Sequence, residues 1–272
     1  MSPPSPMPSA IHEPLQRALA QQLPNSDLEL ISVACCESTN QLCAQLARHG
    51  VVVVADQQTA GRGRRGRQWH SAEPGNIYCS IGMKKRLPGA SLGLLSLAVG
   101  LSIARALQSR GVDDVRLKWP NDILLHDAKL GGILIENRVL SAEEFFLVIG
   151  FGLNLNLDPS VIDAIGQPAI ALNHVVSDPV DREQLLPLLV AEIFQSVSHF
   201  QPAQSQNLIQ QFSELDYYHG QAVRLMVGTD EIHGHYLGIA ADGQLRVKTE
   251  AGEQCFAAAE ISLRGTLNAV DR

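Results

Sequence analysis

Arginine and glycine alternate in a short segment whose residue types suit the binding of an anion. Residues 61–67 read Gly-Arg-Gly-Arg-Arg-Gly-Arg, in a chain whose formal net charge is −7. Guanidinium groups present a planar fork of donors that fits phosphate and carboxylate oxygens. Glycine lets backbone N–H groups approach a ligand closely and tolerates positive φ. Alone, the segment fits a solvated basic loop, a nucleic-acid-binding loop or a mobile loop that folds around a small polyanion.

A second polar group stands in residues 118–122, Lys-Trp-Pro-Asn-Asp. Because proline cannot donate to a β-ladder, the strand predicted over residues 115–119 must end there. The lysine suits neutralisation of a phosphate, and the carboxylate suits magnesium, which takes few protein oxygens beside substrate phosphates. A polar turn in which Asn121 and Asp122 cap the next segment is an equally weighted alternative.

Glycines interrupt two further predicted strands. Residues 129–136 read Lys-Leu-Gly-Gly-Ile-Leu-Ile-Glu, and the adjacent glycines predict a bulge or a close approach of the backbone to another group. Lys129 beside them is either a solvated hairpin lysine or a cation near developing negative charge. Residues 150–156, Gly-Phe-Gly-Leu-Asn-Leu-Asn, leave room for a ligand, although a single Gly-x-Gly is weak support.

The hydrophobic pattern predicts the elements that position these groups. A β-branched run at 51–55 predicts a buried strand directly before the arginine-rich loop. Ser38 and Gln41 match a capping box at the start of a helix. We expect further helices at 11–23, 94–104, 182–200 and through Phe212, and strands at 28–33, in the second half of 69–83, and at 123–125, 130–136 and 145–157. Short strands from residue 218 onward, with turns at 242–243 and 251–252, predict a small barrel.

Composition excludes several classes of protein. With 45% hydrophobic and 18% charged residues, the 272-residue chain can bury a core, and an acidic balance argues against a general nucleic-acid binder. The five cysteines form no CxxC pair, which fits reduced thiols in a cytoplasmic protein, with Cys35 and Cys36 in a buried strand. Residues 1–10 lack the pattern of a signal peptide, and the apolar run at 92–104 is too short to span a membrane.

The motifs occur in one order along the chain. Ser38-Thr39-Asn40 is followed by QTAGRGRRGRQW at 58–69, KWPND at 118–122, KLGGILIE at 129–136 and IGFGLNLN at 149–156. Over residues 28–265 this arrangement resembles the bacterial biotin–protein ligases. The resemblance implies an α+β fold, with a mixed β-sheet catalytic domain and flanking helices similar to class II aminoacyl-tRNA synthetases, plus a small SH3-like C-terminal β-barrel. The expected divisions are 1–27, a disordered leader and short helix, 28–216, the biotin/ATP-binding catalytic domain, and 217–272, the barrel.

The resemblance also implies roles for individual residues. The catalytic residues would be Arg64, Lys118, Asp122 and Lys129, with Asp122 as a ligand of magnesium. The biotin-binding residues would be Ser38, Thr39, Asn40, Gln58, Arg62, Gly63, Arg64, Lys129, Gly132 and Gly150. The nucleotide-binding residues would be Arg62, Arg64, Arg67, Trp69, Lys118, Asn121 and Asn154.

The activity implied is an ATP- and Mg²⁺-dependent ligation. Biotin would be activated as biotinyl-5′-AMP and transferred to a lysine of a biotin carboxyl carrier protein. Family members that also repress transcription carry an N-terminal DNA-binding domain, for which residues 1–27 are too few, so we expect no DNA partner. We expect no membrane partner, and either a monomer or a homodimer. The alternatives are a biotin-responsive repressor and a lipoate or octanoate ligase. The arginine-rich loop and KWPND argue against the lipoate or octanoate ligase.

Overall fold

The computed structural model describes residues 12–71, 75–158, 167–227, 229–258 and 261–265. Its helices are α1 His12–Gln22, α2 Thr39–Leu46, α3 Leu92–Gln108, α5 Arg182–His199 and α6 Ser205–Leu215. The first seven strands are β1 Glu29–Cys36, β2 Val51–Gln58, β3 Ile77–Arg86, β4 Val115–Lys118, β5 Asp122–Leu125, β6 Ala128–Val139 and β7 Glu144–Leu153. The last five are β8 Ala222–Val227, β9 Asp230–Ile239, β10 Leu245–Thr249, β11 Gly252–Phe256 and β12 Ile261–Gly265.

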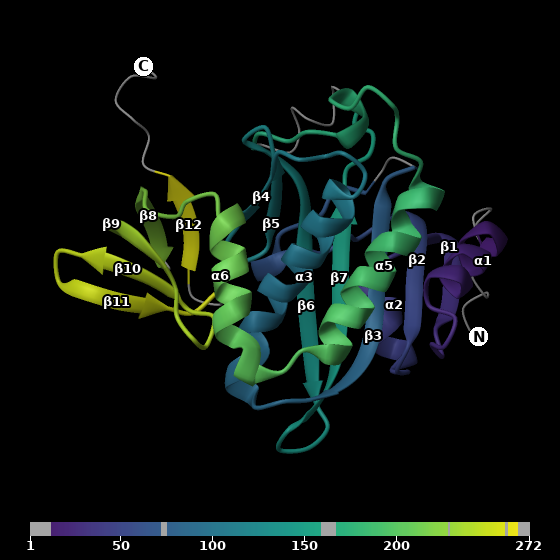
Figure 1. The fold of residues 1–272 in the computed structure, drawn as a ribbon, viewed down its shortest axis with the longest axis horizontal. Coiled ribbons are helices and arrows are strands. Elements are labelled where there is room, and N and C mark those ends of the chain that lie inside the picture. Colours follow the sequence, from purple (N-terminus) through teal and green to yellow (C-terminus); the bar gives the residue numbers. More distant parts are fainter. Residues whose placement is uncertain (1–11, 72–74, 159–166, 228, 259–260, 266–272) are drawn as a thin grey trace.

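Two sheets organise the chain, as Figure 1 shows. The larger has the strand order β1-β2-β3-β7-β6-β5-β4, and the smaller has the order β11-β10-β9-β8-β12. In the larger sheet β1 and β2 pair in parallel and the other neighbours pair antiparallel. The predicted α+β class, a mixed sheet with flanking helices and a small SH3-like C-terminal unit, is confirmed.

Side chains of β7 alternate between two different environments. Leu147, Ile149 and Phe151 belong to the large core that the sheet forms with α3 and α5. Phe146 and Val148 point to the other face, into a smaller cluster with α2. Further along β7, that second face carries the glycines of residues 150–152 in place of large side chains. Near the end of β7 the sheet face that bears α2 therefore has room for groups from other segments to pack against the strand backbone.

The predicted hairpin and bulge are both present. His126 and Asp127 have φ values of 47° and 62° and form the two-residue turn between β5 and β6. The pairing register of these strands shifts between Ile123 and Leu124, opposite the adjacent glycines. A Cβ on Gly131 would lie 2.6 Å from the carbonyl oxygen of Gly152, so the close approach of β6 to β7 requires glycine.

The N-terminal helix and strand complete one edge of the sheet. Leu15 and Leu19 of α1 are buried in the large core, and α1 lies beside α5 (Figure 1). Cys35 on β1 is exposed and Cys36 is half-buried, so the expectation of two buried thiols is wrong; β1 is the edge strand, with a neighbour on one side only. The predicted leader at 1–10 lies outside the described residues, and the division at residue 27 stays a prediction.

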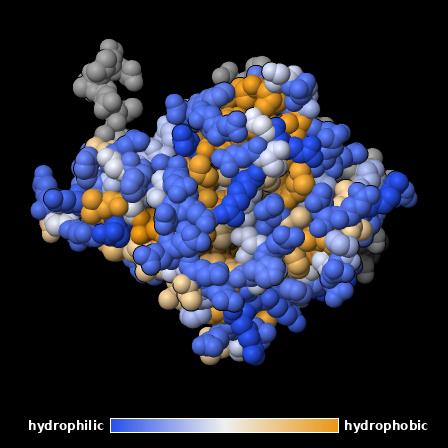
Figure 2. Space-filling view, viewed as in Figure 1, coloured by the Kyte–Doolittle hydropathy of each residue, from blue (hydrophilic) through white to orange (hydrophobic). Residues whose placement is uncertain are grey.

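Helix α3 is longer than its sequence pattern indicated. With the preceding turn it covers Gly89–Gln108, which is long and apolar enough to cross a membrane, so the expectation of too short a segment is wrong. However, 72% of its apolar window is buried inside the structure. The surface over α3 and α5 shows hydrophilic side chains around scattered hydrophobic ones rather than an apolar belt (Figure 2). The helix is thus a core helix of this fold.

The KWPND segment connects the sheet to the barrel. Trp119 is 1% exposed, and its indole N–H donates to the carbonyl of Gly243 at 3.2 Å, in the turn between β9 and β10. The same turn packs tightly on α3, where a Cβ on Gly93 would lie 3.0 Å from the carbonyl oxygen of Asp242. The barrel is therefore fixed against the polar end of β4.

A half-buried carboxyl group, that of Asp216, lies at the same junction. Asp216 accepts hydrogen bonds from the Tyr236 hydroxyl and, at 3.3 Å, from the backbone N–H of Tyr218. Burial raises the pKa of Asp216 from 3.8 to about 7, against the opposing effect of these two hydrogen bonds. Between these two pH values the native state holds a proton that the unfolded state has released.

We expect this proton to make the free energy of unfolding fall as the pH rises from 3.8 to about 7, with a limiting slope of ~1.4 kcal/mol per pH unit. Asp216→Asn keeps an acceptor for Tyr236 but cannot ionise, so the variant should lack this pH-dependent part of the free energy of unfolding. Urea unfolding of both proteins across the range measures it, and the difference between them removes the contribution of other groups. If the free energy of unfolding varied with pH in the same way for both proteins, the raised pKa of Asp216 would be contradicted.

Candidate active site

A cavity of about 1060 Å³ opens on the α2 face of the sheet. Its walls come from the start of α2, the arginine-rich loop, the strand ends of the sheet and the first residues of the barrel. All of the residues predicted from the sequence to bind biotin, nucleotide or magnesium line it: Ser38, Thr39, Asn40, Gln58, Arg62, Gly63, Arg64, Arg67, Trp69, Lys118, Asn121, Asp122, Lys129, Gly132, Gly150 and Asn154.

The arginine-rich loop is folded onto its own backbone as a short turn. Arg62 and Gln68 form an isolated antiparallel bridge, and the N–H of Gly63 donates to the carbonyl of Arg67 at 2.7 Å. Arg65 takes a φ of 58° at the tip. The turn therefore presents its alternate arginines to different walls of the cavity.

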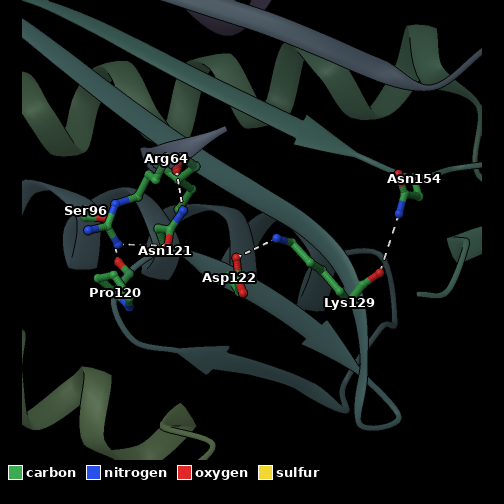
Figure 3. Close-up of polar contacts among 8 residues, drawn as sticks. Arg64, Ser96, Pro120, Asn121, Asp122, Lys129 and Asn154 are labelled. Atoms are coloured by element: carbon green, nitrogen blue, oxygen red, sulfur yellow. Dashed lines mark hydrogen bonds and ion pairs between the residues drawn. The ribbon is translucent and has the colours of Figure 1, made fainter. Parts of the chain in front are cut away.

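Two arginines of this loop have partners on distant segments. Arg64 donates to Asn121 Oδ1 at 3.2 Å and to the carbonyl of Ala258 (Figure 3). Burial lowers the pKa of Arg64, while the charge of Asp122 opposes that shift. Arg62 forms an ion pair of 3.1 Å with Glu136 on β6. The loop thus bridges the sheet, the KWPND turn and the segment after β11.

Lys129 points into the cavity and does not lie on the solvated outside of the hairpin. Its Nζ is 2.8 Å from Asp122 Oδ1 and 5.5 Å from the centre of the Trp69 ring (Figure 3). The side chains of Lys129 and Asp122 are 18% and 19% exposed, so water screens this pair only partly. A partly desolvated ammonium at this place provides a strong attraction for an anion.

The cavity offers few protein ligands for a metal ion. Among the described residues no group of three or more His, Cys, Asp or Glu side chains is placed to hold one. The lining carboxylates are Asp122 and Asp127. Magnesium needs few protein oxygens when phosphates supply the others, so Asp122 fits a metal delivered with a nucleotide better than a resident metal.

The indole of Trp69 covers the glycines of two strands. A Cβ would lie 2.8 Å from its ring at Gly152 and 3.3 Å from its ring at Gly132, so the glycines make room for tryptophan. The indole N–H is buried and has no hydrogen-bond partner within the described residues. Nearby, the Asn154 amide donates to the carbonyl of Ile170 at 3.3 Å. The ring lines the cavity and is placed to contact a flat ligand.

The start of α2 differs from the predicted capping box. Ser38 occupies the N-cap position with φ −157° and ψ 134°, but its side chain makes no cap hydrogen bond in the described part of the chain. The Gln41 side chain donates to Glu37 at 2.8 Å, whereas in a capping box it would accept from the backbone N–H of Ser38. The expected capping role of Ser38 is therefore wrong. Ser38 is 3% exposed and lines the cavity, so its hydroxyl lies at the wall.

The sequence of this chain is similar to protein families and individual proteins of known activity. A sequence model described as the biotin/lipoate A/B protein ligase family matches residues 32–154, and one described as the biotin protein ligase C-terminal domain matches 218–264. The bifunctional ligase/repressor BirA of Salmonella typhimurium is 34% identical over 262 residues, covering 94% of this chain and 81% of that protein. The chain belongs to the biotin protein ligases of this family.

Two further relatives match nearly their whole length. The biotin–[acetyl-CoA-carboxylase] ligase of Paracoccus denitrificans is 30% identical over 241 residues, covering 84% of this chain and 98% of that protein. The solved structure of the Aquifex aeolicus biotin protein ligase in complex with biotin and ATP has a TM-score of 0.74 and 30% identity, covering 88% of this chain and 99% of that chain. The predicted family and enzyme class are confirmed.

Several lining residues of the ligase were missed by sequence reasoning. From the sheet, the cavity gains Tyr78 on β3, which no motif marked in the sequence. From the barrel side the cavity gains Tyr217, Tyr218, Gln221 and Arg224. Their sequence gives no signal, because nothing in it shows which side of the barrel meets the sheet.

Gly150 supplies a sharp test of this wall of the ligase. The Asn40 amide occupies the space in which a Cβ of residue 150 would stand. Gly150→Ala should displace Asn40, lower the free energy of unfolding by about 1–3 kcal/mol and weaken biotin binding at least ~10-fold. Calorimetric titration and thermal unfolding measure the two effects. Gly89→Ala is the matched control, since its nearest contact is 3.7 Å away, and equal behaviour of both variants would contradict the packing argument.

Proposed function

We propose that this ligase joins biotin to AMP and then transfers the biotinyl group to a lysine of a biotin carboxyl carrier domain. The observation that carries the proposal is one cavity in which Lys129, Arg64 and Lys118 line the wall together with the polar start of α2. An elongated ligand with a polar head and an anionic tail fits such a cavity. The relatives' printed activities support the same substrates.

In the first step two anions must react. A carboxylate oxygen of biotin attacks the α-phosphorus of ATP, the bond to the β-phosphate breaks, and pyrophosphate leaves. Lys129 screens the repulsion and meets charge that grows on the phosphoryl oxygens, because its ammonium is fixed by Asp122 at 2.8 Å before substrate arrives. In the second step the lysine amine of the carrier attacks the carbonyl of the mixed anhydride and AMP leaves.

The cavity divides into two regions under this proposal. Ser38, Thr39 and Gln58 bind the ureido end of biotin, while Gly132 and Gly150 line the channel for its rings and chain. Arg62 and Gly63 close over the carboxylate end. The nucleotide-side residues are Arg64, Arg67, Trp69, Lys118, Asn121 and Asn154, and a nucleotide-borne magnesium ion contacts Asp122.

The arginine-rich loop acts as a lid over the intermediate. An acyl-adenylate hydrolyses in water, so a covered cavity favours transfer over loss. Arg64 ties the loop to Asn121 and to Ala258 next to the barrel, which closes that side of the cavity. We place the reaction in the cytoplasm with a carrier domain as protein partner, with no repressor role.

The decisive assay is ATP–pyrophosphate exchange with the purified full chain, run side by side with biotin, lipoate and octanoate. We expect exchange with biotin, and biotinylation of a purified carrier domain when it is added. Exchange driven only by lipoate or octanoate would replace the biotin assignment with a lipoyl one. Sequence-specific duplex binding that weakens steeply with salt would support the repressor alternative.

A further inference from the structure

A chain of hydrogen bonds runs behind the wall of the cavity at the proposed ureido end. Ser80 on β3 is 0% exposed and does not line the cavity. Its hydroxyl oxygen lies 2.8 Å from Thr39 Oγ1 and 2.6 Å from Asn40 Oδ1. Thr39 Oγ1 is also 3.2 Å from Gln58 Oε1. Each hydroxyl has a single proton, so the direction of every bond in this chain is decided by its ends.

One end fixes the Asn40 amide. Its Nδ2 faces two groups that only accept, the carbonyl of Leu134 at 3.2 Å and the Glu136 carboxylate at 2.8 Å. The reversed amide would bring its oxygen against both. Asn40 Oδ1 therefore faces Ser80, and an amide oxygen accepts only. Ser80 must give its proton to Asn40, which leaves the Ser80 oxygen as an acceptor for Thr39.

The other end fixes Gln58. The backbone N–H of Thr39, which can only donate, points at Gln58 Oε1 at 2.8 Å. If the Gln58 amide were reversed, its NH₂ group would face the Thr39 N–H, and two donors would point at each other. The Gln58 Nε2 group in turn donates to Ser71 Oγ at 2.9 Å. Gln58 thus also presents an acceptor to the Thr39 hydroxyl.

Both protein neighbours of the Thr39 hydroxyl are consequently acceptors, and its single proton is donated to Ser80, the nearer of the two at 2.8 Å against 3.2 Å for Gln58. We propose that Ser80 is a specificity-determining positioning residue: with its proton committed to Asn40, it holds the Thr39 hydroxyl so that only oxygen lone pairs face the cavity. The site then selects a ligand that donates an N–H at this point. It rejects an isostere that presents an oxygen there, because two acceptors would oppose each other without a proton between them.

This inference rests on the proposed function, in which the ureido ring of biotin enters this end of the cavity. A cyclic urea carries two N–H donors, of which one faces Thr39. The useful probes are the two biotin analogues in which either ureido N–H is replaced by a ring oxygen. Their shape is nearly unchanged, and the analogue altered on the side away from Thr39 is an internal control.

The experiment measures dissociation constants of biotin and both analogues for the full chain by calorimetric titration. For the wild type we expect one analogue to bind about 100-fold more weakly than the other, or worse. Ser80→Ala should lower the ratio of the two analogues' dissociation constants by ~10-fold or more, because the Thr39 hydroxyl loses the nearer acceptor of its proton and can turn that proton toward the ligand. Thr39→Ser should keep the wild-type ratio.

A second cycle separates this role from a loss of packing. In Thr39→Val, which can neither donate nor accept, the ratio should fall close to one, and adding Ser80→Ala should not change it further. The inference would be overturned if the two analogues had equal dissociation constants in the wild type, or if Ser80→Ala kept the wild-type ratio of these constants. In either case, binding of biotin itself would still support the proposed function. A wild-type chain that bound no biotin would overturn both.

Discussion

Lys129→Ala is expected to lower biotin-dependent ATP–pyrophosphate exchange by ~1000-fold or more. The Lys129 side chain is 18% exposed, and its ammonium lies near Asp122 and the ring of Trp69, where a ligand carboxylate or phosphate meets it with limited screening. Without it, charge growing on the reacting oxygens has no fixed cation at this place, and Asp122 adds uncompensated negative charge. The initial rate of exchange at saturating biotin and ATP measures the loss.

The fold must survive for this result to count. Thermal unfolding of Lys129→Ala should stay close to the wild type, since the side chain contributes a partly exposed ion pair rather than core packing. Lys248→Ala, at an exposed position on β10, is the matched control and should exchange normally. Near-normal turnover of Lys129→Ala would return Lys129 to the role of a hairpin surface residue.

Arg64→Ala is expected to release biotinyl-adenylate about 100-fold faster than the wild type. The guanidinium of Arg64 connects the loop to Asn121 and to Ala258, and its loss frees the lid from both. Arg64 is half-buried, and this burial lowers the pKa of its guanidinium. Dissociation of radiolabelled adenylate after a chase with unlabelled biotin gives the rate.

The loop itself provides the control for that measurement. Arg65→Ala removes an equal charge from the exposed tip of the same turn, so it reports how much a change in net charge alone contributes. We expect it to retain adenylate far better than Arg64→Ala. Equal release from both variants, or unchanged retention in Arg64→Ala, would remove the role of Arg64 as a latch.

Order and spacing along the chain predicted much of this molecule. The strand over 51–55 and the break at Pro120 were predictable because they depend on local chemistry: β-branched packing and a missing N–H. The adjacent glycines at 131–132 predicted a bulge for the same reason. The predicted site residues came from the family resemblance that the motif order carries, and all of them line the cavity.

Predictions that depended on long-range partners were less successful. Ser38 and Gln41 have the residue types of a capping box, yet Gln41 bonds to Glu37 and the Ser38 hydroxyl lies at the cavity wall. Cys35 looked buried, but β1 became the edge of the sheet. In both cases the local pattern was compatible with several outcomes, and the order of strands and the neighbouring loop selected one.

The sequence alone determined most of the elements and the family resemblance, because periodicity and motif order are properties of the chain itself, and that resemblance pointed to many of the residues that line the cavity. The tertiary structure decided what those residues do to each other. It placed Asn40 over Gly150 and Trp69 over Gly152, turned the barrel toward the sheet, and set the direction of the bonds through Ser80. Such contacts join segments far apart in the chain, and a hydroxyl donates or accepts according to the neighbours that folding brings to it.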